Sequence, residues 1–262
     1  MIPVLLGCAG LALPVAVLAQ AAPAAPTAKH RPAKPRAVKP RAAKPRTPAA
    51  APAASAAPED VSPSPAATRV ADWIAASGDN HALPYIIVDK QAASLLLFDA
   101  QGKPLGRAPV LIGVAVGDDA TPGIGSKNLA EIGPAEKTTP AGRFLAKFGL
   151  AFGRERILWV DFATSVALHP IPPGAKPKER RRQRMLSPTP DDNRITFGCI
   201  NVPSALYSKT LRPLFLKKGG YVYVLPDTKP LETVFPQLLA QGVANHGAAD
   251  SDHSLSASAP PP

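Results

Sequence analysis

Two residues, Cys199 and His169, carry side chains that could act as a nucleophile and its base. Cys199 lies in the segment 194–203 (RITFGCINVP), and His169 ends the apolar segment 157–168 (ILWVDFATSVAL). A thiol attacks a carbonyl as its thiolate, so it needs a base nearby. A cysteine and a histidine distant in sequence are the minimum for nucleophilic acyl transfer. Taken alone, the two residues also fit a buried thiol and a structural histidine.

The cysteine count isolates Cys199. The chain has two cysteines, and Cys8 lies in an uncharged apolar stretch, Met1 to Ala19, that is followed by small residues. We expect residues 1–21 to be a signal peptide that is removed, although the segment 5–8 (LLGC) also resembles a lipoprotein processing box. Cys199 would then be the sole thiol, so it is either reactive or bridged to another chain, and a metal site built on several cysteines is excluded.

The residues around Cys199 favour a reactive thiol. Pro203 is suited to the first turn of a helix, whose N-terminal partial charge would lie near the sulfur. Gly198 allows close approach of a substrate, and the N–H groups of Gly198 and Cys199 could receive a developing oxyanion.

Three elements in this order resemble the L,D-transpeptidase (YkuD-type) catalytic domain: the segment 139–144 (TPAGRF), His169, and the segment 198–202 (GCINV). The resemblance covers roughly residues 84–225. It implies a mainly β fold and an exported enzyme that needs no cofactor and no metal. It also implies cleavage of the bond between the third residue of a peptidoglycan stem and the fourth, D-Ala. The acyl group would pass through a thioester to an amine, giving a 3→3 crosslink or an attached protein.

The resemblance also assigns roles to individual residues. Cys199 would be the nucleophile, His169 its base, Pro170 the residue whose carbonyl orients the histidine, and Gly198 a contributor to the oxyanion hole. Asn201 occupies the polar position of the motif. The residues expected to bind substrate are Thr196, Phe197, Asn201 and Arg194.

The chain departs from the family pattern at three places. Phe197 stands where the family has His or Arg, and Pro170 replaces a glycine. His169 and Cys199 are 30 positions apart, a long interval for the family, and we call residues 171–194 within it the insertion. Its basic residues are Lys176, Lys178, Arg180, Arg181, Arg182 and Arg184. They could form a flap that binds stem-peptide carboxylates, or a solvated loop. Two other functions therefore stay open: an L,D-carboxypeptidase or other hydrolase with the same Cys–His chemistry, and a non-catalytic wall-binding protein.

The elements that must position these residues read mainly as strands. Alternating or continuous apolar segments predict strands at 85–88, 94–98, 108–116, 142–148, 157–168 and 220–225, and a helix is expected over 203–211. The predicted fold is a β-sandwich or partly closed barrel with a short helix after Cys199. The expected domain organisation is a signal peptide (1–21), a disordered basic Pro/Ala-rich linker (22–67), a short helix and lead-in (68–81), the catalytic domain (82–227), and a C-terminal helix with a disordered tail (228–262).

Charge is concentrated in the linker. The net charge is +11, and the segment from Lys29 to Arg46 holds eight Lys or Arg and no acidic residue. Such a segment is either a solvated tether or an attachment to anionic envelope polymers. Nucleic acid is not an expected partner, because no aromatic residues interleave the charges. Peptidoglycan stems are the expected partner, the periplasm or envelope the expected location, and no membrane span is expected after signal cleavage.

Two further patterns have simpler interpretations. The aspartate pairs 118–119 and 191–192 could suggest paired carboxylates for glycoside cleavage, but we expect solvated turn residues. Trp73 and Trp159 are expected to pack in the core rather than to bind sugars.

Overall fold

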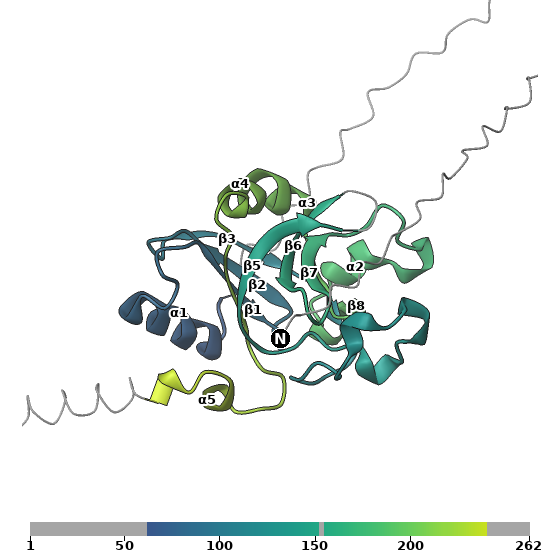
Figure 1. Ribbon diagram of the computed structural model, residues 1–262, viewed down its shortest axis with the longest axis horizontal. Helices are drawn as coiled ribbons and strands as arrows, with labels where there is room; N and C mark the ends of the chain where they lie inside the picture. The colour runs from purple at the N-terminus through teal and green to yellow at the C-terminus, as the bar shows by residue number, and fades with distance from the viewer. Residues whose placement is uncertain (1–61, 152–154, 240–262) are drawn as a thin grey trace, which may run out of the picture. The chain divides into compact units, whose positions relative to one another are not determined.

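The computed structural model describes residues 62–151 and 155–239 (Figure 1). The expected signal peptide, most of the basic linker and the end of the expected tail lie outside the described residues. No helix within the two described segments is long and apolar enough to cross a membrane.

Ten strands and five short or medium α-helices form the described part of the chain. In chain order they are α1 (Pro65–Ser77), β1 (Tyr85–Asp89), β2 (Ser94–Phe98), β3 (Pro104–Pro109), β4 (Ile112–Gly113), β5 (Gly142–Leu150), β6 (Arg156–Asp161), β7 (Val166–Pro170), α2 (Arg181–Met185), β8 (Arg194–Thr196), β9 (Ile200–Val202), α3 (Ser204–Leu206), α4 (Arg212–Phe215), β10 (Gly220–Val224) and α5 (Leu231–Val234).

Eight strands form one sheet in the order β3-β2-β1-β10-β5-β6-β7-β9, and β4 pairs separately with β8. The sheet curls toward closure because the chain just after β3 returns to its other edge. There Leu111 and Asn201 exchange two backbone hydrogen bonds of 2.9 Å. The predicted mainly β fold with a short helix after Cys199 is therefore confirmed.

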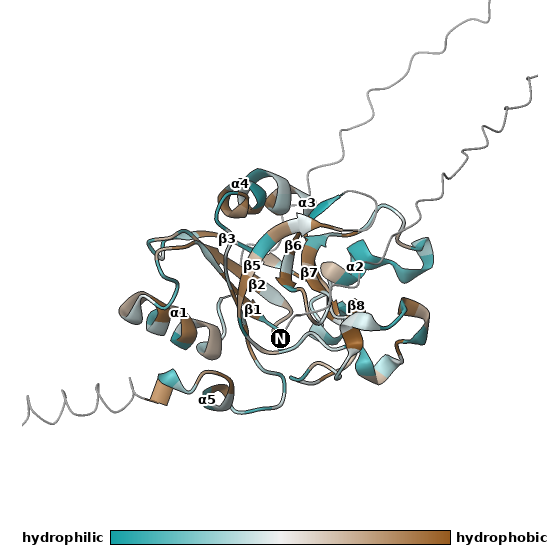
Figure 2. Ribbon diagram, in the orientation of Figure 1, coloured by the Kyte–Doolittle hydropathy of each residue, from teal (hydrophilic) through white to brown (hydrophobic). Residues whose placement is uncertain are grey.

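Alternating side chains of the sheet supply two hydrophobic clusters, because successive residues of a strand point to opposite faces. In β1, Ile86 and Val88 belong to the interior cluster with Leu168 of β7, whereas Tyr85 and Ile87 face α1. Burial on both faces explains why β1 and β10 read as continuous apolar segments. In Figure 2 the strands of the sheet carry much of the hydrophobic colour, while the region around α2 is largely hydrophilic.

Helix α1 shows how local signals set an element. Ser64 caps its start, with the Oγ accepting a hydrogen bond from the Ala67 N–H at 3.1 Å, and Gly78 ends it with a φ of 69°. Trp73 on its buried face packs edge-on against Tyr223, with ring centroids 6.0 Å apart.

The structure moves several predicted boundaries. Helix α1 begins at Pro65 rather than 68, and it shares a core cluster with the segment after β10, so the compact domain extends beyond the predicted 82–227. The predicted strand 108–116 is divided, because the chain bends after β3 ends at Pro109 to reach Asn201, and β4 covers only Ile112–Gly113. The predicted strand 157–168 is two strands joined by a turn. The helix predicted over 203–211 runs on to Phe215 through a π-helical segment, and the insertion contains α2 rather than only loop.

Candidate functional site

The pairing of β7 with β9 sets the geometry of the candidate site. The two strands run parallel, with His169 opposite Asn201 and Leu168 opposite Ile200. Continued by one residue, this register places Cys199 beside Ala167, two positions from His169. Extended to Cys199, which directly precedes β9, the alternation of side chains between the faces of a ladder puts His169 and Cys199 on the same face. Residues thirty positions apart in sequence become diagonal neighbours.

The imidazole of His169 contacts the carbonyl of Pro170, the residue to which the family resemblance assigned this role. Its Nδ1 lies 2.7 Å from the Pro170 oxygen. A carbonyl only accepts hydrogen bonds, so this contact assigns the proton of the neutral ring to Nδ1 and leaves Nε2 as the basic nitrogen. Burial lowers the pKa of His169 below 6.5, against the opposing effects of the Pro170 contact and of Glu155. The ring is therefore neutral, and able to act as a base, at neutral pH.

The thiol of Cys199 is half-buried and is not bonded to another cysteine. Its Sγ donates a long hydrogen bond of 3.7 Å to the carbonyl of Ser165, in the turn before β7. Burial raises the pKa of the thiol above 9.0, and hydrogen bonding by the Ala167 backbone and the charge of Arg181 offset part of this rise. At neutral pH the pair rests as a neutral thiol and a neutral imidazole, so attack requires proton transfer to a base.

The loop before Cys199 is held from two sides. The Thr139 hydroxyl donates to the Gly198 carbonyl at 2.9 Å, and the Thr196 hydroxyl donates to the Cys199 carbonyl at 2.6 Å. Gly198 has a φ of 123°, and a Cβ there would lie 2.6 Å from the Thr138 oxygen. This position needs glycine for conformation and for space. The Gly198 N–H donates to Thr196 Oγ1 at 3.2 Å, so it already has an acceptor in this structure.

A buried cluster of charges supports the same loop. Lys90 is fully buried, and its Nζ lies 2.9 Å from Asp118, 3.2 Å from Asp227 and 3.0 Å from the Thr139 carbonyl. Arg194 binds Asp227 through both of its terminal nitrogens, at 2.6 and 3.3 Å. Burial alone would raise the pKa of Asp118, but hydrogen bonds from the 227–229 backbone, Lys90 and Thr228 hold it well below 3.8.

This cluster corrects the expectation for Asp118 and shows how Arg194 is engaged. Asp118 was expected to be solvated, but its carboxylate is buried because five donors surround it. Arg194 was expected to bind substrate, but its guanidinium is occupied by Asp227. Thr196 likewise is buried, with its hydroxyl committed to the Cys199 loop. Both side chains are therefore engaged by groups of the protein itself.

The other two expected substrate-binding residues lie beside Cys199. Phe197 is 41% exposed, and the Lys137 Nζ lies 3.9 Å above its ring. Asn201 is fully buried; its Oδ1 accepts a hydrogen bond of 2.8 Å from Arg181 Nη1, and its Nδ2 has no partner among the described residues.

Arg181 and Lys90 are the site residues that sequence reasoning did not single out. Arg181 belonged to the predicted basic insertion, but nothing in the sequence separated it from its five basic neighbours. Lys90 and Asp118 carry no sequence signal, because a buried ion pair and a solvated one use the same residue types. Within the described segments, no group of three or more His, Cys, Asp or Glu is gathered to hold a metal ion.

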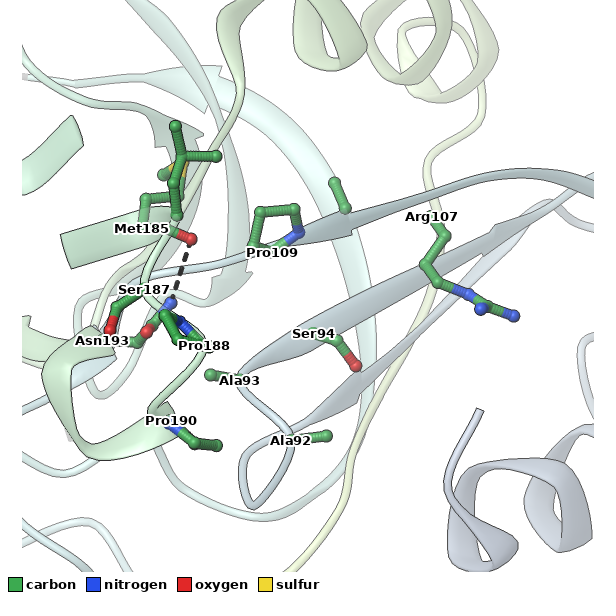
Figure 3. A pocket seen from close by; sticks show the side chains of 12 residues that line it. Ala92, Ala93, Ser94, Arg107, Pro109, Met185, Ser187, Pro188, Pro190 and Asn193 are labelled. Carbon is green, nitrogen blue, oxygen red and sulfur yellow. Dashed lines mark hydrogen bonds between the residues drawn. The ribbon is translucent and has the colours of Figure 1, made fainter. Parts of the chain in front are cut away.

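A separate pocket of about 410 Å³ lies away from this pair (Figure 3). It is lined on one side by residues 92–94 at the start of β2 and residues 107–109 of β3, and on the other by residues 185–188, Pro190 and Asn193 of the insertion. Asn193 fixes that part of the insertion by donating to the Val110 carbonyl at 2.7 Å. Neither Cys199 nor His169 lines this pocket.

Comparisons with known proteins give fold-level likenesses alone. No protein-family model and no curated protein matches the chain. Over 54% of its length the chain is similar to a solved L,D-transpeptidase from Xylanimonas cellulosilytica, with 13% identity, 60% of that chain covered and a TM-score of 0.32. Over the same share it is similar to a mutant L,D-transpeptidase from Enterococcus faecium, with 17% identity, 49% of that chain covered and a TM-score of 0.29. The L,D-transpeptidase from Mycobacterium smegmatis is similar with 14% identity, 58% of that chain covered and a TM-score of 0.31. The match thus spans about half to three fifths of those chains. Identities and scores this low do not transfer chemistry, so function has to follow from the residues of the site.

Proposed function

We propose that this chain is a cysteine acyltransferase that acts on peptidoglycan stem peptides, an L,D-transpeptidase. The observation that supports the proposal is the register of β7 and β9: continued one residue before β9, it puts the backbone of Cys199 beside Ala167, two positions from His169. The contact between His169 Nδ1 and the Pro170 carbonyl adds the third member of the arrangement, because it leaves Nε2 to take a proton. The substrate class follows from the resemblance of the Thr139, His169 and Cys199 elements, in this order, to the L,D-transpeptidase family.

The reaction begins with a neutral pair. His169 Nε2 takes the proton of the Cys199 thiol as the sulfur attacks the carbonyl carbon of the third stem residue. The bond from that carbon to the D-Ala nitrogen then breaks, and the imidazolium returns the proton to the leaving amine. A thioester to Cys199 remains. The acceptor amine attacks it, gives a proton to His169, and forms a new amide as the thiol is restored.

Stabilisation of the oxyanion would fall to the loop before the nucleophile. The Gly198 N–H can contribute if it exchanges its long contact with Thr196 for the substrate oxygen. Phe197 provides an apolar surface at the same place rather than a charged donor. Water could also resolve the thioester, which would make the protein an L,D-carboxypeptidase.

A direct test incubates the protein lacking residues 1–21 with tetrapeptide muropeptides and follows the products by mass spectrometry. We expect release of D-Ala and formation of dimers. Cys199→Ala and His169→Gln should abolish both products, whereas His81→Gln, at an exposed histidine, should change neither. Release of D-Ala without dimers would assign hydrolysis, and an unchanged reaction in Cys199→Ala would refute the cysteine mechanism.

The location and the role of the basic linker form a second part of the proposal. We place the protein in the periplasm or envelope, with residues 22–67 tethering it or binding anionic polymers. Sedimentation with isolated sacculi should then weaken when residues 22–61 are removed. Binding that needs only this segment and survives Cys199→Ala, without any acyl transfer, would favour the non-catalytic wall-binding protein.

A further inference from the structure

Arg181 brings a positive charge from the insertion to the candidate site. It opens α2, and its Nη1 reaches twenty residues along the chain to Asn201 Oδ1, at 2.8 Å. Asn201 is the strand partner of His169 and lies two residues after Cys199. The guanidinium therefore lies beside the residue that links both members of the pair.

The environment of this charge is mostly buried. The Arg181 side chain is 13% exposed, so water screens its field weakly. Its charge lowers the pKa of His169 and the pKa of Cys199 alike, which is the effect of a cation near both groups. By contrast, Arg182, its neighbour on α2, is exposed.

The donors of Arg181 are only partly used. A guanidinium has five N–H donors in a planar fork. Nε donates to Glu179 Oε2 at 2.7 Å and Nη1 to Asn201, while Nη2 has no hydrogen-bond partner among the described residues. The end of the fork, formed by Nη1 and Nη2, has the geometry that binds a carboxylate with two parallel hydrogen bonds.

Asn201 gives an independent indication that an acceptor is missing at this place. Its Nδ2 is buried and has no acceptor within the described segments, a condition that few buried amides show. Its Oδ1 is held by Arg181, so a flip of the amide would turn two donors toward each other. An oxygen atom brought in by a ligand next to Arg181 would supply the missing partner.

We propose that Arg181 binds a carboxylate of the acyl donor, and that the site selects donors with a free carboxylate within a few bonds of the carbonyl attacked by Cys199. Glu179 holds the guanidinium in place through Nε and weakens its field until that carboxylate arrives. This inference deepens the proposed function and rests on it for the identity of the donor, but the charge selectivity of the site can be tested without peptidoglycan.

The first test compares two small alkylating probes of Cys199, iodoacetate and iodoacetamide, which differ by one carboxylate. The ratio of their rates reports attraction of a carboxylate to the thiol and cancels changes in thiol pKa. We expect Arg181→Met to lower the iodoacetate-to-iodoacetamide ratio on the order of fivefold. Arg182→Met, the matched control, should leave the ratio unchanged. Glu179→Gln should raise the ratio, since it removes the competing carboxylate.

Two outcomes of this test would overturn the proposal: an unchanged ratio in Arg181→Met, or an equal fall in Arg182→Met. Arg181→Lys keeps the charge without the planar fork, so it should restore much of the ratio and show that a loss in Arg181→Met is not a failure to fold. Circular dichroism of each variant gives a second check of folding.

The second test uses stem tetrapeptides and identifies the carboxylate. The third residue of each peptide is diaminopimelate. One peptide has the terminal D-Ala carboxylate and the side-chain carboxylate of the third residue free, one is amidated at the terminal D-Ala, and one is amidated at the side chain of the third residue. For wild type, we expect kcat/KM to be lower on one of the two amidated peptides than on the peptide with free carboxylates. For Arg181→Met, we expect similar kcat/KM values on these two peptides. Equal rates on all three would refute the selection. If wild type released no D-Ala from any peptide, the proposed function would fail, and the alkylation ratio would still decide the role of Arg181.

Discussion

Lys90 offers the sharpest test of how the fold holds the site. Its side chain is fully buried, and its Nζ contacts the carboxylates of Asp118 and Asp227 and the carbonyls of Gly117 and Thr139, all within 2.6 to 3.2 Å. Lys90→Met keeps most of the apolar stem and removes only the cation. The substitution should also disturb the Cys199 loop, because Lys90 Nζ binds the Thr139 carbonyl and the Thr139 hydroxyl binds the Gly198 carbonyl.

The expected magnitude follows from which charges remain. Arg194 still pairs with Asp227, so Asp118 is the carboxylate that loses its cation while keeping its backbone donors. Removing one partner of a buried ion pair typically lowers the free energy of unfolding by about 3–5 kcal/mol. The matched control is Lys229→Met, since Lys229 pairs with Asp119 at the surface, where such pairs contribute roughly 0–1 kcal/mol.

Urea unfolding followed by tryptophan fluorescence measures both values, and alkylation of Cys199 measures the effect on the site. We expect Lys90→Met to be less stable than Lys229→Met by at least about 2 kcal/mol, with a slower reaction of Cys199. The folded-state pKa of Asp118 lies below its ordinary value of 3.8. The stability that the ionised carboxylate contributes is therefore fully present above pH 3.8 and is lost as the pH falls through the folded-state pKa. Acid sensitivity should therefore weaken in Lys90→Met. Equal stabilities of the two variants would refute the reasoning.

Three further predictions concern the loop, the thiol and the outer core. Gly198→Ala should slow alkylation of Cys199 on the order of 100-fold, because the new Cβ would collide with the Thr138 carbonyl and shift the Cys199 loop. An alkylation rate equal to that of wild type would contradict the need for glycine at this position. The rate of Cys199 with iodoacetamide should still rise above pH 9, since burial raises its pKa, and a plateau near neutrality would instead indicate a preformed ion pair with His169. Trp73→Ala should lower the free energy of unfolding by about 3–5 kcal/mol in urea titrations, whereas a loss under 1 kcal/mol would show that α1 is not part of the domain core.

The sequence by itself determined the features that depend on nearby residues. Gly78 ends α1 because a left-handed stop acts within one turn, whereas the expected start at 68 overlooked the Ser64 cap. The apolar pattern of β1 and β10 gives strands because burial on both faces needs continuous hydrophobic residues. Cys199 and His169 stood out because their residue types and the motifs around them do not depend on distant contacts. Whether they act together did depend on such contacts.

Only the tertiary structure decided which charges are buried and which residues meet. Lys90, Asp118 and Asp227 look like solvated residues in sequence, and they become one cluster because segments up to 137 positions apart pack together. Arg181 reaches Asn201 because the insertion folds back over β9, whereas Arg182 beside it faces outward. The register of β7 and β9 is set by backbone pairing that the sequence does not encode locally. Charge burial and strand register are long-range properties, so a linear pattern cannot specify them.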